Sequence, residues 1–188
     1  MKRFLFVLTV LVIAACAGTS PPIYYLQLSA GDEELPQSDD PVIYLDAIAV
    51  PDYMLRDELL VRDSAYSIRY LSSHRWAEPI DLGIQRVLAT RLESVTGSRQ
   101  VISFPDVPRK PTDWNLRVVV RHFEAAGNEV QLSAEGRLER AEATQGASAV
   151  ISFEDRALLA SDDAEVIAAR MSELLWRFTD ELAAAIKE

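Results

Sequence analysis

The stretch WNLRVVVRHFEAAGNEVQLSAEGRLE, residues 114–139, decides the fold of this chain. Its apolar and polar residues alternate, which is the period of a strand with one buried face. In the first half, the buried face is formed by Trp114, Leu116, Val118 and Val120. In the second half, it is formed by Val130, Leu132, Ala134 and Leu138. Because Gly127-Asn128 between the halves is typical of a tight turn, the stretch predicts an antiparallel hairpin with one solvated face.

The same alternation assigns the remaining side chains of the first half. Its opposite face is predicted to hold Asn115, Arg117, Val119, Arg121 and Phe123. His122 then continues the apolar face near the end of the strand, where a hydrogen-bonded edge histidine fits better than a catalytic base.

Shorter strands are predicted on both sides of this hairpin. They are expected at residues 23–28, 42–50, 59–62, 66–70, 99–104 and 149–153, which are rich in aliphatic and aromatic side chains. The third and fourth of these flank Asp63-Ser64-Ala65 and are predicted to form a second hairpin.

The first helix is predicted from about Pro79 to Val95. Proline suits the first helical turn, where its missing N–H costs nothing. Gly97, just beyond the last turn, is a typical helix C-cap. The apolar face is formed by Ile80, Ile84, Val87, Leu88, Leu92 and Val95, and it requires a partner surface.

The second helix is predicted from Asp162-Asp163, where the carboxylates suit an N-cap, to about Lys187. Its buried stripe is formed by Ile167, Met171, Leu174, Leu175, Phe178, Leu182 and Ile186. Trp176 lies off this stripe. It is interpreted either as a flanking residue folded over the sheet edge or as a contact for a partner.

Two amphipathic helices and a mostly antiparallel sheet predict an α+β fold, with both helices packed on one face of the sheet. Residues 23–188 are expected to form a single domain, and the sequence contains no internal repeat. That length is ordinary for one hydrophobic core.

Residues 1–15 have the layout of a secretory signal. Lys2 and Arg3 precede an apolar run at 4–13, which is too short to span a bilayer. Cys16 follows Ile13-Ala14-Ala15, as in a bacterial lipoprotein box, so we expect diacylglycerol and further acyl chains on its sulfur. The alternative is an ordinary signal peptide with a cysteine nearby by chance.

A lipidated Cys16 determines the expected location of the chain. Two or more acyl chains hold a protein stably on a membrane, so residues 16–22 are interpreted as a lipidated tether on the periplasmic face of the envelope. Ala17 stands where an aspartate often signals inner-membrane retention, which favours the outer membrane. No other cofactor is expected.

The mature chain is strongly acidic. Loss of Lys2 and Arg3 leaves 17 basic and 29 acidic residues, a net charge of −12. Such a charge disfavours nucleic acid and anionic membrane surfaces as partners.

The sequence has no pattern typical of an enzyme. His74 and His122 lack metal-ligand spacing and a thiol partner, and the serines form no nucleophile elbow. There is no phosphate-binding glycine loop, and Asp39-Asp40 is explained by a solvated loop. We therefore expect neither catalysis nor a metal site.

The most informative stretch is residues 50–62, VPDYMLRDELLVR, followed by residues 74–79, HRWAEP. Together with Tyr24-Tyr25-Leu26 and Arg86-Val87-Leu88-Ala89, in this order, the stretch resembles the ABC-type transport auxiliary lipoproteins of the Pqi-associated group. The resemblance covers nearly the whole mature chain. Asp57 departs from it, because relatives often carry a proline there, and this loosens a turn.

The resemblance implies a subunit of an envelope system for lipids or other lipophilic molecules. Its expected partner is a periplasmic MCE-domain protein and, through it, an inner-membrane permease and ATPase. Residues expected to dock the partner are Tyr53, Arg56, Arg75, Trp76 and Glu78. In the structural interpretation, Trp76 instead staples the helix start to the sheet, while Arg75 and Glu78 cap or pair.

Two other functions remain open at this point. One is a lipid-binding carrier with its own apolar cavity between helices and sheet, and the other is a scaffold for outer-membrane assembly. Self-association of the domain also remains open.

Overall fold

The structure is a computed structural model that describes residues 22–31, 36–141 and 148–187. The predicted signal segment 1–15 and the lipidation site Cys16 lie outside these residues. Within the described ranges, every helix is too short or too polar to cross a membrane.

Among the described residues, eight strands form one mixed sheet, confirming the predicted sheet. They are β1 (Tyr24–Leu26), β2 (Ile43–Leu45), β3 (Glu58–Ser64), β4 (Ser67–Trp76), β5 (Val101–Ser103), β6 (Trp114–Ala126), β7 (Glu129–Arg140) and β8 (Ser148–Leu158). The long pairs β3–β4, β6–β7 and β7–β8 are antiparallel. The short pairs β1–β4, β2–β5, β2–β6 and β3–β6 are parallel.

Strand β6 is the centre of the sheet. One of its edges pairs with β7 along almost its whole length. Its other edge is shared, because β2 pairs in parallel with its beginning and β3 pairs in parallel with its end. Between them, Ala49 forms an isolated bridge to Val119. The hairpin β3–β4 and strand β1 are therefore attached to the rest of the sheet at the end of β6.

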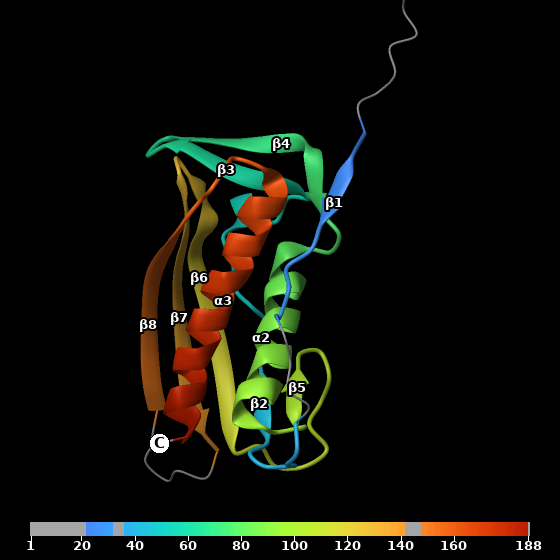
Figure 1. Cartoon of the computed structure of the whole chain (residues 1–188). Coiled ribbons are helices and arrows are strands. Elements are labelled where there is room, and N and C mark those ends of the chain that lie inside the picture. Colours follow the sequence, from blue (N-terminus) through green and yellow to red (C-terminus); the bar gives the residue numbers. More distant parts are fainter. Residues whose placement is uncertain (1–21, 32–35, 142–147, 188) are drawn as a thin grey trace, which may run out of the picture.

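Helices α2 (Ile80–Thr96) and α3 (Ala164–Lys187) lie side by side on one face of the sheet (Figure 1), as predicted. Gly97 ends α2 with φ 75°, and its N–H donates to the Glu93 carbonyl at 2.9 Å. Asp163 Oδ1 accepts the N–H of Glu165 at 3.1 Å at the start of α3. The predicted stripe of α3 is buried throughout. A short 3-10 helix, η1 (Asp52–Met54), precedes β3.

The predicted alternation in β6 is wrong beyond Val120. A β-bulge at Arg121 shifts the register, so that Val120 pairs with Ala134 and His122 pairs with Ser133. The inserted residue turns the later side chains to the opposite faces. Phe123 is therefore in the core at 1% exposure, whereas His122 is on the solvent face with half of its side chain exposed.

Two strands extend beyond their predicted ends. Strand β4 reaches Trp76, because β1 pairs with it at residues 74–76. Strand β8 reaches Leu158 through the charged residues Glu154, Asp155 and Arg156, because the register with β7 continues without a break. Pairing with a neighbour overrides composition in both cases.

Helix α3 packs closely against the sheet at Gly136 of β7. A Cβ atom at this position would overlap Leu182 Cδ2, and Leu182 is completely buried. Because Gly136 has no side chain, Phe178 and Leu182 of α3 can pack directly against β7 at this position.

We expect Gly136→Ala to lower the free energy of unfolding by about 1–3 kcal/mol, the usual cost of overpacking a core. Backbone entropy alone favours alanine over glycine in a strand by about 0.5–1 kcal/mol, so a loss must arise from the clash with Leu182. Urea unfolding measures the change. Ser133→Ala, on the solvent face of the same strand, is the control, and a Gly136→Ala protein as stable as the natural chain would contradict this packing.

Candidate functional site

The structure separates the five residues predicted to dock a partner. Trp76 is 8% exposed and belongs to the core. Its backbone N–H donates to the Asp57 carbonyl at 2.6 Å, and the next residue, Ala77, donates to the Leu26 carbonyl of β1 at 2.8 Å. Trp76 thus joins three chain segments, in agreement with its structural interpretation.

Arg75 and Glu78 each form an ion pair. Arg75 Nη2 lies 3.7 Å from Glu58 Oε1 on the neighbouring strand β3. Glu78 Oε1 accepts from Arg86 Nη2 of α2 at 2.6 Å, and the same nitrogen also donates to the Leu28 carbonyl at 2.8 Å. Arg86 therefore ties Glu78, just before α2, to the segment that follows β1.

Tyr53 and Arg56 come together at the side chain of Tyr70. The Tyr70 hydroxyl donates to the Tyr53 carbonyl at 2.8 Å, and the Arg56 guanidinium lies 5.5 Å from the centre of the Tyr70 ring. Leu55, between them, is half exposed. We call Tyr53, Leu55, Arg56 and Tyr70 the Tyr53 corner.

Beneath the Tyr53 corner lies a buried carboxylate that sequence reasoning missed. Glu124 of β6 is completely buried, and its Oε1 accepts from Arg62 Nε of β3 at 2.5 Å. The Tyr53 hydroxyl donates to Glu124 Oε2 at 3.3 Å, and Gln131 Nε2 donates to Oε1 at 3.4 Å. Three elements and η1 therefore meet at one carboxylate.

The sequence carries no signal for this burial. Glu124 follows Phe123 in an ordinary strand, and only the bulge and the fold of η1 enclose it. The sequence does indicate its partner Gln131, because the two residues are equidistant from the predicted turn at Gly127-Asn128.

The Arg62–Glu124 pair sets the electrostatics of Tyr53. Burial and the negative charge of Glu124 raise the pKa of the Tyr53 phenol, and the Arg62 charge opposes them only partly. The hydrogen bond to Glu124 raises the pKa of Arg62, so the Arg62 guanidinium stays charged. The cluster is thus a fixed support, with a neutral phenol at the surface.

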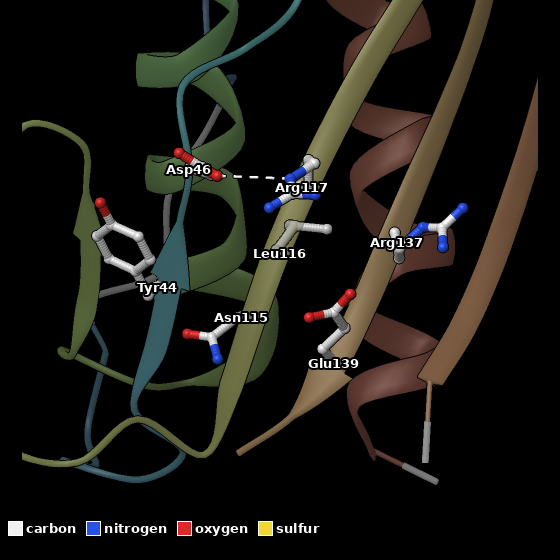
Figure 2. Close-up of a pocket in the computed structure, with 7 residues that line it drawn as sticks. All are labelled: Tyr44, Asp46, Asn115, Leu116, Arg117, Arg137 and Glu139. Carbon is white, nitrogen blue, oxygen red and sulfur yellow. Dashed lines mark ion pairs between the residues drawn. The ribbon is translucent and has the colours of Figure 1, made fainter. Parts of the chain in front are cut away.

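A second feature of the face without helices is a shallow hollow of about 240 Å³ over β2, β6 and β7 (Figure 2). It is lined by Tyr44, Asp46, Asn115, Leu116, Arg117, Arg137 and Glu139. Asp46 Oδ2 lies 3.5 Å from Arg117 Nε, and most of the Arg117 side chain is exposed. Two guanidinium groups and two carboxylates suit polar groups of a partner better than an apolar molecule.

A second hollow, of about 370 Å³, lies between the β1 segment and α3. Tyr25, Ala168 and Trp176 are among its lining residues. Trp176 Nε1 donates to the Ser29 carbonyl at 2.7 Å, and its ring lies against Gly31. This arrangement agrees with the flanking role considered for Trp176.

The described part of the chain holds no group of three side chains able to bind a metal ion. His74 stacks on Tyr24 with ring centres 5.3 Å apart and contacts the neighbouring Ser73 hydroxyl. His122 Nδ1 lies 3.6 Å from Glu124 Oε1 at the surface. These contacts explain both histidines as parts of the fold.

Comparison with known proteins relates the chain to transport lipoproteins. A family model described as ABC-type transport auxiliary lipoprotein component matches residues 24–183. A comparison with curated proteins found no match.

Two solved structures share the fold. A crystal structure of an uncharacterized protein is 18% identical, with a TM-score of 0.73, and the match covers 88% of this chain and 99% of that one. A Xanthomonas campestris protein is 16% identical, with a TM-score of 0.68 and coverage of 88% and 94%. A PelC dodecamer from Paraburkholderia phytofirmans is more distant, at 12% identity, a TM-score of 0.48 and coverage of 88% and 95%.

We expect Glu124→Gln to lower the free energy of unfolding by about 2–4 kcal/mol, because it leaves the Arg62 charge without its partner in a largely desolvated site. Urea unfolding tests this. Asp63→Asn, which breaks the exposed ion pair between Asp63 of β3 and Arg69 of β4, should cost less than about 1 kcal/mol. Equal effects of the two changes would contradict a structural role of the buried pair.

The raised pKa of Tyr53 predicts a loss of stability at alkaline pH. Folding favours the neutral phenol, so its contribution is complete below the ordinary pKa of 10.0 and disappears as the pH rises through the higher folded value. Unfolding free energies at several pH values above neutrality should fall more steeply in the natural chain than in Tyr53→Phe. Parallel curves would refute the assignment.

Proposed function

The chain belongs to the ABC-type transport auxiliary lipoprotein component family, and we propose that it is the membrane-anchored, non-enzymatic subunit that binds the other proteins of its transport system. The motifs at 51–62 and 75–79 support a periplasmic MCE-domain protein as the direct partner. Through this partner the chain would join an inner-membrane permease and ATPase that move lipids or other lipophilic molecules and so support envelope integrity.

The Tyr53 corner is the observation that carries this proposal. It presents tyrosine, arginine and leucine side chains at one surface, and Tyr and Arg dominate the energetics of protein interfaces. The Tyr70 hydrogen bond and the Glu124 network hold these groups from below. A surface that is fixed before binding loses less conformational entropy when a partner arrives.

A non-enzymatic role agrees with the rest of the described chain. Its buried carboxylate is occupied by Arg62, Tyr53 and Gln131, so it is engaged in holding the sheet together. The family description is likewise that of an auxiliary component.

The carrier alternative requires an apolar cavity between helices and sheet. In the described residues this space is filled by side chains with 0–1% exposure, such as Leu132, Phe178 and Leu182. The hollow over β2, β6 and β7 lies on the other face of the sheet and is polar. These observations favour the contact role over the carrier.

Attachment through Cys16 supplies the second half of the proposal. Cys16 and Ala17 lie outside the described residues, and their sequence supports acylation and sorting to the outer membrane. Strand β1 begins at Tyr24, eight residues after Cys16 in the sequence, so a lipidated Cys16 would hold the domain close to the bilayer surface.

Crosslinked pull-down of the lipidated protein from envelopes, followed by mass spectrometry, tests the proposal. We expect recovery of an MCE-domain protein with the natural chain. Arg56→Glu reverses a charge at the Tyr53 corner and should reduce recovery about tenfold, corresponding to ~1.4 kcal/mol of binding free energy. Arg109→Glu, an equal change in charge at an exposed position between β5 and β6, should leave recovery unchanged.

Other outcomes identify the alternatives. Full recovery with Arg56→Glu would remove the Tyr53 corner from the interface. Lipid without a protein partner would support the carrier, and recovery of outer-membrane barrel proteins would support the scaffold. A Cys16→Ser protein that still fractionated with membranes would contradict the anchor.

A further inference from the structure

Strand β8 has one hydrogen-bonded edge and one open edge. It pairs with β7 over eleven residues, from Ser148↔Glu139 to Leu158↔Glu129, without a register shift. None of the other described strands pairs with it, and Figure 1 shows it at the outside of the sheet. Such an edge presents a row of backbone donors and acceptors that can pair with another chain.

The two halves of this edge differ in composition. Residues 154–156 are Glu, Asp and Arg, and charges of this kind protect an edge against pairing. Residues 148–153, SAVISF, carry no charge, and Val150 is half exposed. The first half therefore lacks the charges, prolines and bulges that usually prevent strand pairing.

The first half is complementary to itself in an antiparallel register centred on Ile151. Ile151 then faces Ile151 of a second copy, and Ala149 faces Phe153 on the same side of the sheet. On the other side, Val150 faces Ser152. Because Ser148 faces Glu154, no two like charges meet. We propose that β8 pairs through residues 148–154 with the same strand of a second copy of this chain.

Helix α3 leaves room for this pairing. Arg177 Nη1 lies 2.8 Å from Asp155 Oδ2, which fixes the level of the helix against the strand. The end of α3 lies beside the start of β8 (Figure 1). From Arg177 to Ala185, eight residues along the helix, the rise is about 12 Å. From Asp155 back to Ile151, four residues along the strand, the distance is about 13 Å. The small, uncharged Ala185 is thereby placed near Ile151 at the axis.

Among the described residues, Glu181 is the nearest acidic residue on that side of α3. It lies one helical turn, about 6 Å, from Arg177, and therefore about 6–7 Å from the level of the axis. The two copies of Glu181 would be separated by about 13 Å, which exceeds the Debye length of about 8 Å at physiological salt. Their repulsion is therefore largely screened.

The pairing does not require the lipid anchor or the transport partner. A seven-residue strand pair is a small interface and belongs to the weak class. Attachment of both copies to one membrane would raise their effective concentration and strengthen it.

A cysteine on the axis tests this geometry. Opposed residues of an antiparallel pair have Cα atoms about 4.5–5.5 Å apart, within the range of a disulfide. Lipidated Ile151→Cys protein, purified in detergent and mildly oxidised at high concentration, should form about tenfold more covalent dimer than Leu158→Cys. Leu158 is more exposed, but its two copies would lie about 46 Å apart.

Two measurements separate failure of pairing from other causes. Maleimide labelling of each monomer confirms that the new thiol reacts, and a count of free thiols in the natural chain reports separately on acylation of Cys16. A reactive Ile151→Cys that dimerises no more than Leu158→Cys would overturn the proposal.

Amide hydrogen exchange of the natural chain provides a test that needs no substitution. Exchange at 148–154 should slow as protein concentration rises, while exchange at 155–158 should not. Exchange at 148–154 that is independent of concentration, or that slows only when a different protein is added, would also overturn the pairing of two copies.

Discussion

Hydrogen bonding along both edges of β6 is the constraint on which the rest of this structure depends. Strand β7 occupies one edge, while β2, Ala49 and β3 divide the other among them. Buried backbone donors and acceptors must be paired, so these segments are held in fixed order along one strand. The join with β3 is only two residues long, and the Arg62–Glu124 pair crosses it with a charged hydrogen bond. Together they attach the β3–β4 hairpin, and with it the Tyr53 corner, to the helix-covered part of the sheet.

The helices determine which surfaces remain for function. Helices α2 and α3 bury their apolar stripes on one face of the sheet and are linked to each other by the Arg91–Asp180 pair at 3.0 Å. Gly136 allows the close approach of α3, which leaves the space beneath the helices filled. The helices leave the opposite face of the sheet, the Tyr53 corner and the open edge of β8 uncovered.

The residues expected to dock a partner do not all lie together. Tyr53 and Arg56 lie together, because both belong to the short segment before β3 and both contact the side chain of Tyr70. Trp76 is in the core instead, and Arg75 and Glu78 have partners on β3 and α2. An unusual density of aromatic and charged residues cannot separate these roles, because a buried tryptophan and an exposed one have the same sequence pattern. Glu124 shows the converse, since a carboxylate in a half-exposed strand is buried here by residues distant in the chain.

The sequence by itself determined the elements that local periodicity and end signals specify. The β6–β7 hairpin, both helices and the Gly97 cap follow from side chains within a few positions of one another. Only the tertiary structure decided the bulge at Arg121, the division of the β6 edge between β2 and β3, the burial of Glu124 and the open edge of β8. These features depend on hydrogen bonds and contacts between segments far apart in the chain, whose free energies appear only when the segments meet, and no local pattern records them.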